Sequence, residues 1–150
     1  MVDWKIADLK LRKLIPDDQK AACEEATLWY IDAINKTSIP KNGGWNYARK
    51  AGRDNPDAPS TFMTPPTLQA LFTAKAAGYT VDAKVIEDAL DFLERSRNSV
   101  TKEVVYSGFA RSGGKDDSPG ASGRMCAAES ALVLAGRGSI DNVRHAVDTF

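Results

Sequence analysis

A glycine- and aromatic-rich segment, Asn42-Gly43-Gly44-Trp45-Asn46-Tyr47, constrains the fold of this chain more than any other stretch. It follows an amphipathic segment and precedes a polar loop and an alanine- and leucine-rich segment that includes Thr67-Leu68-Gln69-Ala70-Leu71. Paired glycines reach backbone angles closed to other residues, and Trp and Tyr anchor a loop while their polar atoms still find partners. The segment therefore predicts a hinge that turns one helix into the next.

The same order of elements occurs a second time. Three features recur at offsets of 60 to 62 residues: Ala70-Leu71 as Ala131-Leu132, Gly78 as Gly138, and Tyr47 as Phe109. Each copy consists of an outer amphipathic helix, a long polar loop and an inner apolar helix. Because internal repeats decide architecture, we predict an all-α array of antiparallel helical hairpins. We expect one domain over 1–150, with an arm at 1–15, a first repeat at 16–97 and a degraded, truncated second repeat at 98–150.

The spacing of apolar residues predicts five helices, at 17–36, 65–77, 81–97, 125–135 and 140–150. In the first, one apolar face gathers Ala22, Ala26, Trp29, Tyr30, Ala33 and Ile34. Leu28 and Ile31 lie outside this face, which indicates that a second neighbour, such as the N-terminal arm, packs on this helix. The helix at 65–77 has hardly any polar face, which predicts an inner helix surrounded by others. The helix at 81–97 has one apolar stripe and one charged face, as an outer helix would. Gly78 is expected to cap the inner helix, and Thr80 and Ser139 are expected to begin the helices that follow.

Composition limits the partners. Lysine plus arginine total 20 and aspartate plus glutamate total 20, so no overall field attracts nucleic acid, and we expect no nucleic-acid partner. No apolar run approaches the roughly 20 residues of a membrane span, and the N-terminus lacks a signal-peptide pattern. We therefore expect a soluble protein, cytoplasmic by default.

Cys23 and Cys126 are expected to be small buried hydrophobic residues. The basic arm at 1–15 suits either a membrane surface or, as we prefer, a cover over an apolar groove of its own domain.

A family resemblance rests on the hinge and on the inner helix that ends in Ala76-Ala77-Gly78. Together they resemble the repeats of the α/α-toroid superfamily, which includes squalene and oxidosqualene cyclases and protein prenyltransferase β subunits. The chain is most similar to uncharacterised bacterial members with prenyltransferase and squalene-oxidase repeats. The resemblance covers a good copy at 31–97 and a degraded copy at 91–150, and implies a partial toroid or a small helical bundle. It departs from the family at Ile39, where glutamine is usual, and at Val105 and Ser107, where glycine and tryptophan are usual.

None of the catalytic or metal-binding motifs of that superfamily is complete in this sequence. Cyclases protonate an alkene with an aspartate of a D-x-D-D motif, and the nearest match is Gly114-Lys115-Asp116-Asp117, which lacks the first aspartate and reads by default as a solvated turn. The D-x-C zinc pattern of prenyltransferases and the Cys-Gly-Glu-Gln of thioester domains do not occur. His145 is the single candidate base for Cys126 or Ser130. We expect it on the surface, opposite a buried apolar face formed by Ile140, Val143, Val147 and Phe150. We accordingly expect no cofactor and no metal.

Candidate ligand contacts lie in the two long loops. Trp45, Tyr47, Asp54 and Asp57 in the first, with Asp116 and Asp117 in the second, combine aromatic and acidic groups that suit a sugar or a small apolar ligand. The alternative is that the aromatics only anchor the loop.

A carboxylate at Glu129 on an apolar helix needs a partner, and Arg124 or Arg137 is expected to supply it.

The resulting hypothesis is a non-catalytic binding or scaffolding protein that either self-associates or belongs to a longer chain. The alternative is a fragment of a terpenoid-cyclase-like or polysaccharide-active toroid enzyme whose catalytic residues lie partly outside these residues.

Overall fold

A computed structural model describes residues 13–47, 58–110 and 121–149. In them a short 3-10 turn and five α-helices follow one another: η1 (Asp17–Gln19), α2 (Lys20–Thr37), α3 (Thr64–Ala76), α4 (Ala83–Ser96), α5 (Ala121–Leu134) and α6 (Ile140–Thr149). This part of the chain contains no strand, only two isolated bridges, Ser60 with Ser107 and Arg97 with Val104. The prediction of an all-α protein is confirmed. Within the same residues, no helix combines the length and the apolar character that crossing a membrane requires.

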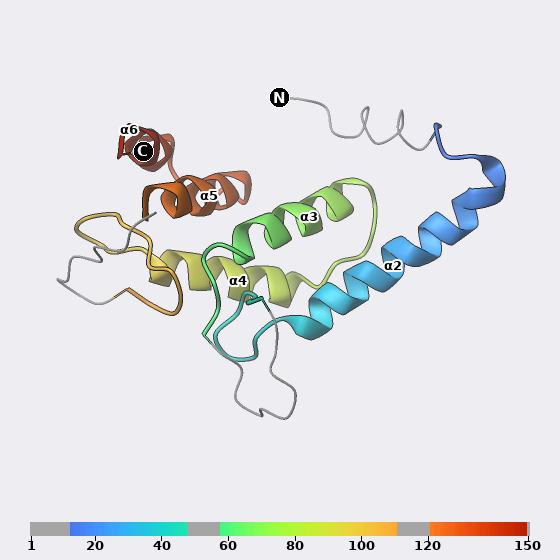
Figure 1. The fold of residues 1–150 in the computed structure, drawn as a ribbon, viewed down its shortest axis with the longest axis horizontal. Coiled ribbons are helices and arrows are strands. Elements are labelled where there is room, and N and C mark those ends of the chain that lie inside the picture. The colour runs from blue at the N-terminus through green and yellow to red at the C-terminus, as the bar shows by residue number, and fades with distance from the viewer. Residues whose placement is uncertain (1–12, 48–57, 111–120, 150) are drawn as a thin grey trace.

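The helices α3, α4 and α5 form the centre of the structure. α3 and α4 pack against each other, α5 packs against both of them, and α6 packs on α5 (Figure 1). α2 contacts the rest mainly through its C-terminal half and projects away from it (Figure 1). The core accordingly lies between α3, α4 and α5, and its largest fully buried apolar side chains are Phe92, Leu68, Leu71, Leu93, Met125, Leu132 and Val104.

The hinge between α2 and α3 folds as its glycines predict. Gly43 and Gly44 have φ values of +75° and +73°, in the left-handed region that favours glycine. Trp45 is 5 % exposed, its indole Nε1 donates to the carbonyl oxygen of Ile34 at 2.9 Å, and its backbone N donates to Oγ1 of Thr64 at 3.1 Å. One residue, through its indole and its backbone N–H, therefore joins the end of α2 to the start of α3, which confirms the predicted anchoring role.

Left-handed glycines also end the two central helices. Gly78 follows α3 with φ +97°, as predicted, and Gly136 follows α5 with φ +74°. Gly136, rather than Gly138, is thus the counterpart of Gly78. Gly138 has a different role, because a Cβ there would lie 2.8 Å from the backbone nitrogen of Val133. Both helices thus end in the same way, at glycines whose spacing is slightly shorter than the predicted one.

The predicted core face of α2 is wrong in part, because only its C-terminal member Ile34 packs against the core. Trp29 is 63 % exposed and Tyr30 is 62 % exposed, whereas Ile31, outside the predicted face, is 7 % exposed. The orientation of the helix is fixed by tertiary contacts: the carbonyl of Ile34 accepts the Trp45 indole, which turns Ile31 inward and the aromatic pair outward. Cys23 is likewise exposed rather than buried, Cys126 is half-buried, and both are free.

Three further expectations need correction. α3 is not surrounded in the described part of the chain, because Ala70 and Ala76 are exposed on the face away from Leu68 and Leu71. The cap of α4 is Asp82 rather than Thr80, since its carboxylate accepts from the backbone N of Lys84 at 2.8 Å.

On α6, the buried residue is Ala146, while the predicted apolar face leaves Ile140 and Val147 exposed. Ser139 does cap this helix, as predicted, because its Oγ accepts from the backbone N of Asn142 at 3.1 Å. Phe150 lies outside the described residues, as do residues 1–12 of the N-terminal arm.

Candidate functional site

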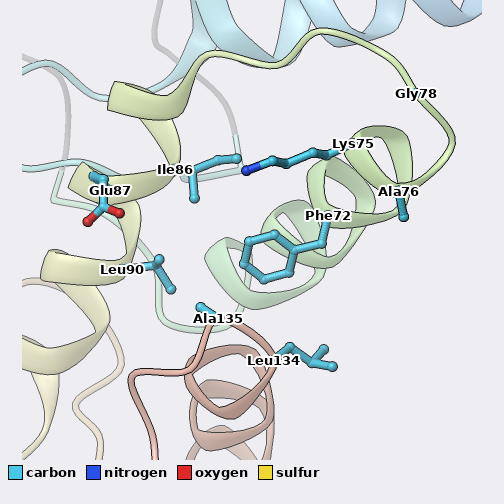
Figure 2. A pocket seen from close by; sticks show the side chains of 9 residues that line it. All are labelled: Phe72, Lys75, Ala76, Gly78, Ile86, Glu87, Leu90, Leu134 and Ala135. Atoms are coloured by element: carbon cyan, nitrogen blue, oxygen red, sulfur yellow. The ribbon is translucent and has the colours of Figure 1, made fainter. Parts of the chain in front are cut away.

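An open groove of about 640 Å³ lies where the C-terminal ends of α3 and α5 meet the first half of α4. Figure 2 shows its lining: Phe72, Lys75, Ala76, Gly78, Ile86, Glu87, Leu90, Leu134 and Ala135. This volume is in the range of sites that hold small molecules. The walls are mainly aliphatic and aromatic, with one cation and one anion at the edge.

The groove exists because two helices stop at the same place. α3 ends before Gly78, and its carbonyls are closed by backbone donors from Gly78 and Tyr79. α5 ends before Gly136 in a similar way, with the backbone N of Arg137 donating to the carbonyl of Leu132 at 2.8 Å. Because backbone donors after the two glycine caps satisfy the last carbonyl groups of α3 and α5, apolar side chains rather than unsatisfied carbonyl groups line the groove.

Phe72 and Leu134 form the accessible apolar surface of the groove. The Phe72 ring points into the space between α3 and α4, and Leu134 lies at the end of α5 next to it (Figure 2). Leu134 is 65 % exposed, which is unusual for the last residue of a helix whose other leucine, Leu132, is fully buried. A ligand in the groove would remove this surface from water.

The two charged groups at the groove differ in their pairing. Glu87 Oε2 accepts from Arg137 Nη1 at 3.0 Å, but Asp91 and Glu94 share that guanidinium, so the charge of Glu87 is only partly offset. No ion pair of the Lys75 ammonium occurs among the described residues, and its side chain crosses the groove toward Ile86 (Figure 2). The groove therefore presents an accessible ammonium beside an apolar wall.

Arg137 fixes the wall that α5 contributes. Its guanidinium also binds Asp91 at 2.6 Å and Glu94 at 2.6 Å, so three carboxylates of α4 hold the turn between α5 and α6. The hydrogen bond to Glu94 and then that to Asp91 raise the pKa of Arg137, which therefore stays charged. Arg137, one of the two partners predicted for Glu129, therefore pairs with other carboxylates.

The partner of Glu129 is Arg97, at the end of α4. Arg97 Nη1 donates to Glu129 Oε1 at 2.6 Å, and Glu129 is almost fully buried. The other expected partner, Arg124, instead donates through Nε to the carbonyl of Val104 at 3.2 Å. Within the described residues Glu129 Oε2 has no hydrogen-bond partner. The ion pair between Arg97 and Glu129 therefore connects α5 to the end of α4. It lies more than one helical turn of α5 away from the groove residue Leu134.

The candidate residues predicted from the loops separate into two groups. Trp45 is buried as an anchor, with its only polar side-chain atom already used. Tyr47 is exposed, its ring stacks on Phe62 at a centroid distance of 6.5 Å, and its hydroxyl lies 3.5 Å from that of Tyr106. That hydrogen bond raises the pKa of Tyr47. The four predicted acids, Asp54, Asp57, Asp116 and Asp117, lie outside the described residues.

The nucleophile and base candidates do not form a catalytic arrangement. His145 is exposed on α6, as predicted. Ser130 donates its hydroxyl to the backbone carbonyl of Cys126 at 2.7 Å, which is the usual bond of a serine inside a helix. Among the described residues, no group of three or more His, Cys, Asp or Glu side chains is placed to hold a metal ion.

Comparison with known proteins adds no assignment: no family model, curated protein or solved structure matches this chain. The groove residues were missed by the sequence analysis, although one signal was available. Lys75 is the only charged residue on the helix at 65–77, and a lone charge on an apolar helix marks a place where that helix meets water or a ligand.

Proposed function

We propose that this chain is a non-catalytic binding module built from α/α-toroid-like helical hairpins, and that its groove takes a small apolar ligand. The observation that carries the proposal is the groove itself. A space of about 640 Å³ between helix ends, with accessible Phe72 and Leu134, has the size and lining typical of small-molecule sites. The lining contains no serine, cysteine or histidine, which favours binding over chemistry.

The hairpin array is supported by the order of contacts. The two apolar helices, α3 and α5, pack against each other, and the amphipathic helices α4 and α6 cover them from outside. Glycine caps at Gly78 and Gly136 place the ends of α3 and α5 together, as expected of two copies of one unit. The arrangement favours a curved array over a bundle with a single closed core, because α3 keeps one exposed face.

A titration with a neutral fluorescent hydrophobe, N-phenyl-1-naphthylamine, tests the proposal. We expect saturable binding to the full chain, weakened several-fold by Leu134→Gln because this change places an amide on the groove wall. Leu28→Gln is the matched control, since Leu28 is also an exposed leucine, on α2 and away from the groove. Absence of saturable binding, or equal loss in both variants, would show that the groove is not a ligand site.

A further inference from the structure

We infer that residues 1–12 of the N-terminal arm form a helix that folds back on the outward face of α2 and covers Trp29. The outward face is the set of residues that recur every three or four positions on the side of α2 opposite Ile31: Ala22, Ala26, Trp29 and Ala33. Among the described residues, α2 contributes none to the groove lining, so the inference is independent of the proposed ligand. It rests on the exposure of this face, the reach of the arm, and the match in size and charge between the two.

The two sides of α2 differ in burial. Ile31 is 7 % exposed and Ile34 packs against the core, whereas Trp29 on the opposite side is 63 % exposed and Tyr30 beside it is 62 % exposed. The two exposed rings meet edge to face with their centroids 5.0 Å apart, so they form one aromatic surface. α2 also projects away from the other helices, which leaves room on this side (Figure 1). A large apolar surface on a projecting helix marks an interaction site.

The arm is attached where it can reach this face. The chain makes a turn directly before α2, in which the backbone N of Gln19 donates to the carbonyl of Pro16 at 2.9 Å. An arm that folds back at this turn runs antiparallel to α2. Because a helix advances about 1.5 Å per residue, a helical arm brings Trp4 as far along α2 as Trp29 and Ala33.

The side chains of the arm and of the outward face have complementary sizes. Trp4, Ala7 and Leu11 fall at helical spacing, so they share one face of a helical arm. Antiparallel packing about the turn produces three layers between the two helices. The layers are Trp4 with Ala33, Ala7 with Trp29, and Leu11 with Ala26. Each large side chain therefore meets an alanine, which is the alternation of large and small residues that lets facing helices interdigitate.

Net charge selects the arm over a second copy of the chain as the cover. Residues 1–13 contain four basic and two acidic residues, whereas residues 17–37 contain two basic and five acidic residues. Two copies of α2 would bring like charges together, but the arm brings opposite charges to the same surface. The arm is also tethered to α2, so its effective concentration at this face is about millimolar. A second copy would have to exceed that concentration to displace it.

One ion pair at the edge of the contact fixes the register. Lys10 directly precedes Leu11, and Glu25 directly precedes Ala26, so the layer of Leu11 with Ala26 places Lys10 beside Glu25. Asp32, the next acid on this edge of α2, is already in an ion pair within the helix. An exposed ion pair contributes modestly to affinity, but reversing one of its charges replaces attraction by repulsion. The pair therefore offers a test of register as well as of docking.

Acrylamide quenching of tryptophan fluorescence tests the inference on the full chain. In a Trp4→Phe background the remaining tryptophans are Trp29 and Trp45, and Trp45 is buried, so the accessible signal reports Trp29. We expect Lys10→Glu or Glu25→Lys to increase the quenching of Trp29 about two- to threefold, because each change shifts the arm toward its undocked state. The double variant should restore the original protection.

Lys5→Glu is the matched control, since it makes the same charge change on a side of the helical arm that does not face Glu25, and it should increase quenching much less. If Trp29 is quenched equally in the Trp4→Phe chain and in both charge variants, the arm does not cover α2. If the double variant stays as accessible as the single ones, the proposed register is wrong. Protection that disappears on about 100-fold dilution, with dimers detected by light scattering before dilution, would assign the cover to a second copy and overturn the inference.

Discussion

Replacing Gly43 by alanine is the sharpest test of how the hinge joins α2, α3 and α4. A Cβ built at this position lies 2.0 Å from the carbonyl oxygen of Asp88 and 2.9 Å from the backbone nitrogen of Ala89, both on α4. These are backbone atoms inside a helix, so they cannot turn aside as a flexible side chain would. The hinge itself must therefore move away from α4.

The cost of Gly43→Ala has two parts. A left-handed φ of +75° costs alanine about 1–2 kcal/mol. Moving the hinge by more than about 1 Å, which an ordinary C···O contact of about 3.3 Å requires, also loosens the neighbouring anchor, Trp45. Losing its hydrogen bond to Ile34 costs about 1 kcal/mol, and disturbed packing of its buried ring costs about as much again or more. The sum is roughly 3–5 kcal/mol, a large part of the stability of an ordinary domain.

Gly78→Ala provides the matched control. Gly78 also has a positive φ, +97°, but a Cβ there meets nothing within 4 Å. This variant should lose only the backbone part, about 1–2 kcal/mol. Urea unfolding followed by tryptophan fluorescence and circular dichroism should show a midpoint for Gly43→Ala that lies about 1–2 M below that of Gly78→Ala. Equal midpoints would refute the close approach of the hinge to α4, and with it the placement of α2.

Three further experiments test other parts of the structure. Trp45→Phe should lower the free energy of unfolding by about 1–3 kcal/mol in urea titrations, because the indole hydrogen bond to Ile34 and part of the buried ring are lost, while affinity for the naphthylamine stays unchanged. Glu129→Ala should cost about 3 kcal/mol by the same measurement, since it leaves Arg97 as a half-buried charge, and Glu129→Leu combined with Arg97→Met should recover most of this loss. Trp29→Ala should change stability by less than about 1 kcal/mol, whereas Ile31→Ala should cost about 2–4 kcal/mol; the reverse order would restore the core face predicted from the sequence.

Sequence patterns predicted those elements whose structure depends on near neighbours. The stripe of α4 formed by Ile86, Ala89, Leu90 and Leu93 is buried as predicted, because its period matches a helix with one face in water. The caps at Gly78 and Ser139 also follow from single residues next to a helix end. The α4 cap was assigned two residues too early, because Thr80 and Asp82 are both good capping residues and only the backbone geometry distinguishes them.

The orientation of α2 could not be predicted in the same way. Its sequence offers two apolar faces, one with Trp29 and Tyr30 and another with Ile31. If the burial of apolar area alone determined the orientation of α2, the face with Trp29 and Tyr30 would lie against the core. What decides instead is a hydrogen bond from the distant Trp45 to Ile34, together with the close packing of the hinge on α4. Periodicity contains no information about such long-range contacts.

The groove could not be predicted from the sequence for a related reason. Phe72, Leu90 and Leu134 are far apart in sequence, and each reads as an ordinary core residue of its own helix. They form one wall only because α5 packs against the α3–α4 hairpin with its last turn beside the last turn of α3. The pairing of Glu87 with Arg137 depends on the same packing.

The length of α3 separates the two regions that could contact a ligand. Trp45 is bonded to Thr64 in the first turn of α3, whereas Lys75 lies in its last turn, roughly 16 Å away along the helix axis. A ligand that fits the groove therefore cannot also reach the rings at Tyr47. If the exposed cluster of Tyr47, Phe62 and Tyr106 binds anything, it does so independently, and a variant in one region should leave the affinity of the other unchanged. The hinge that organises the fold thus acts on the groove only through stability.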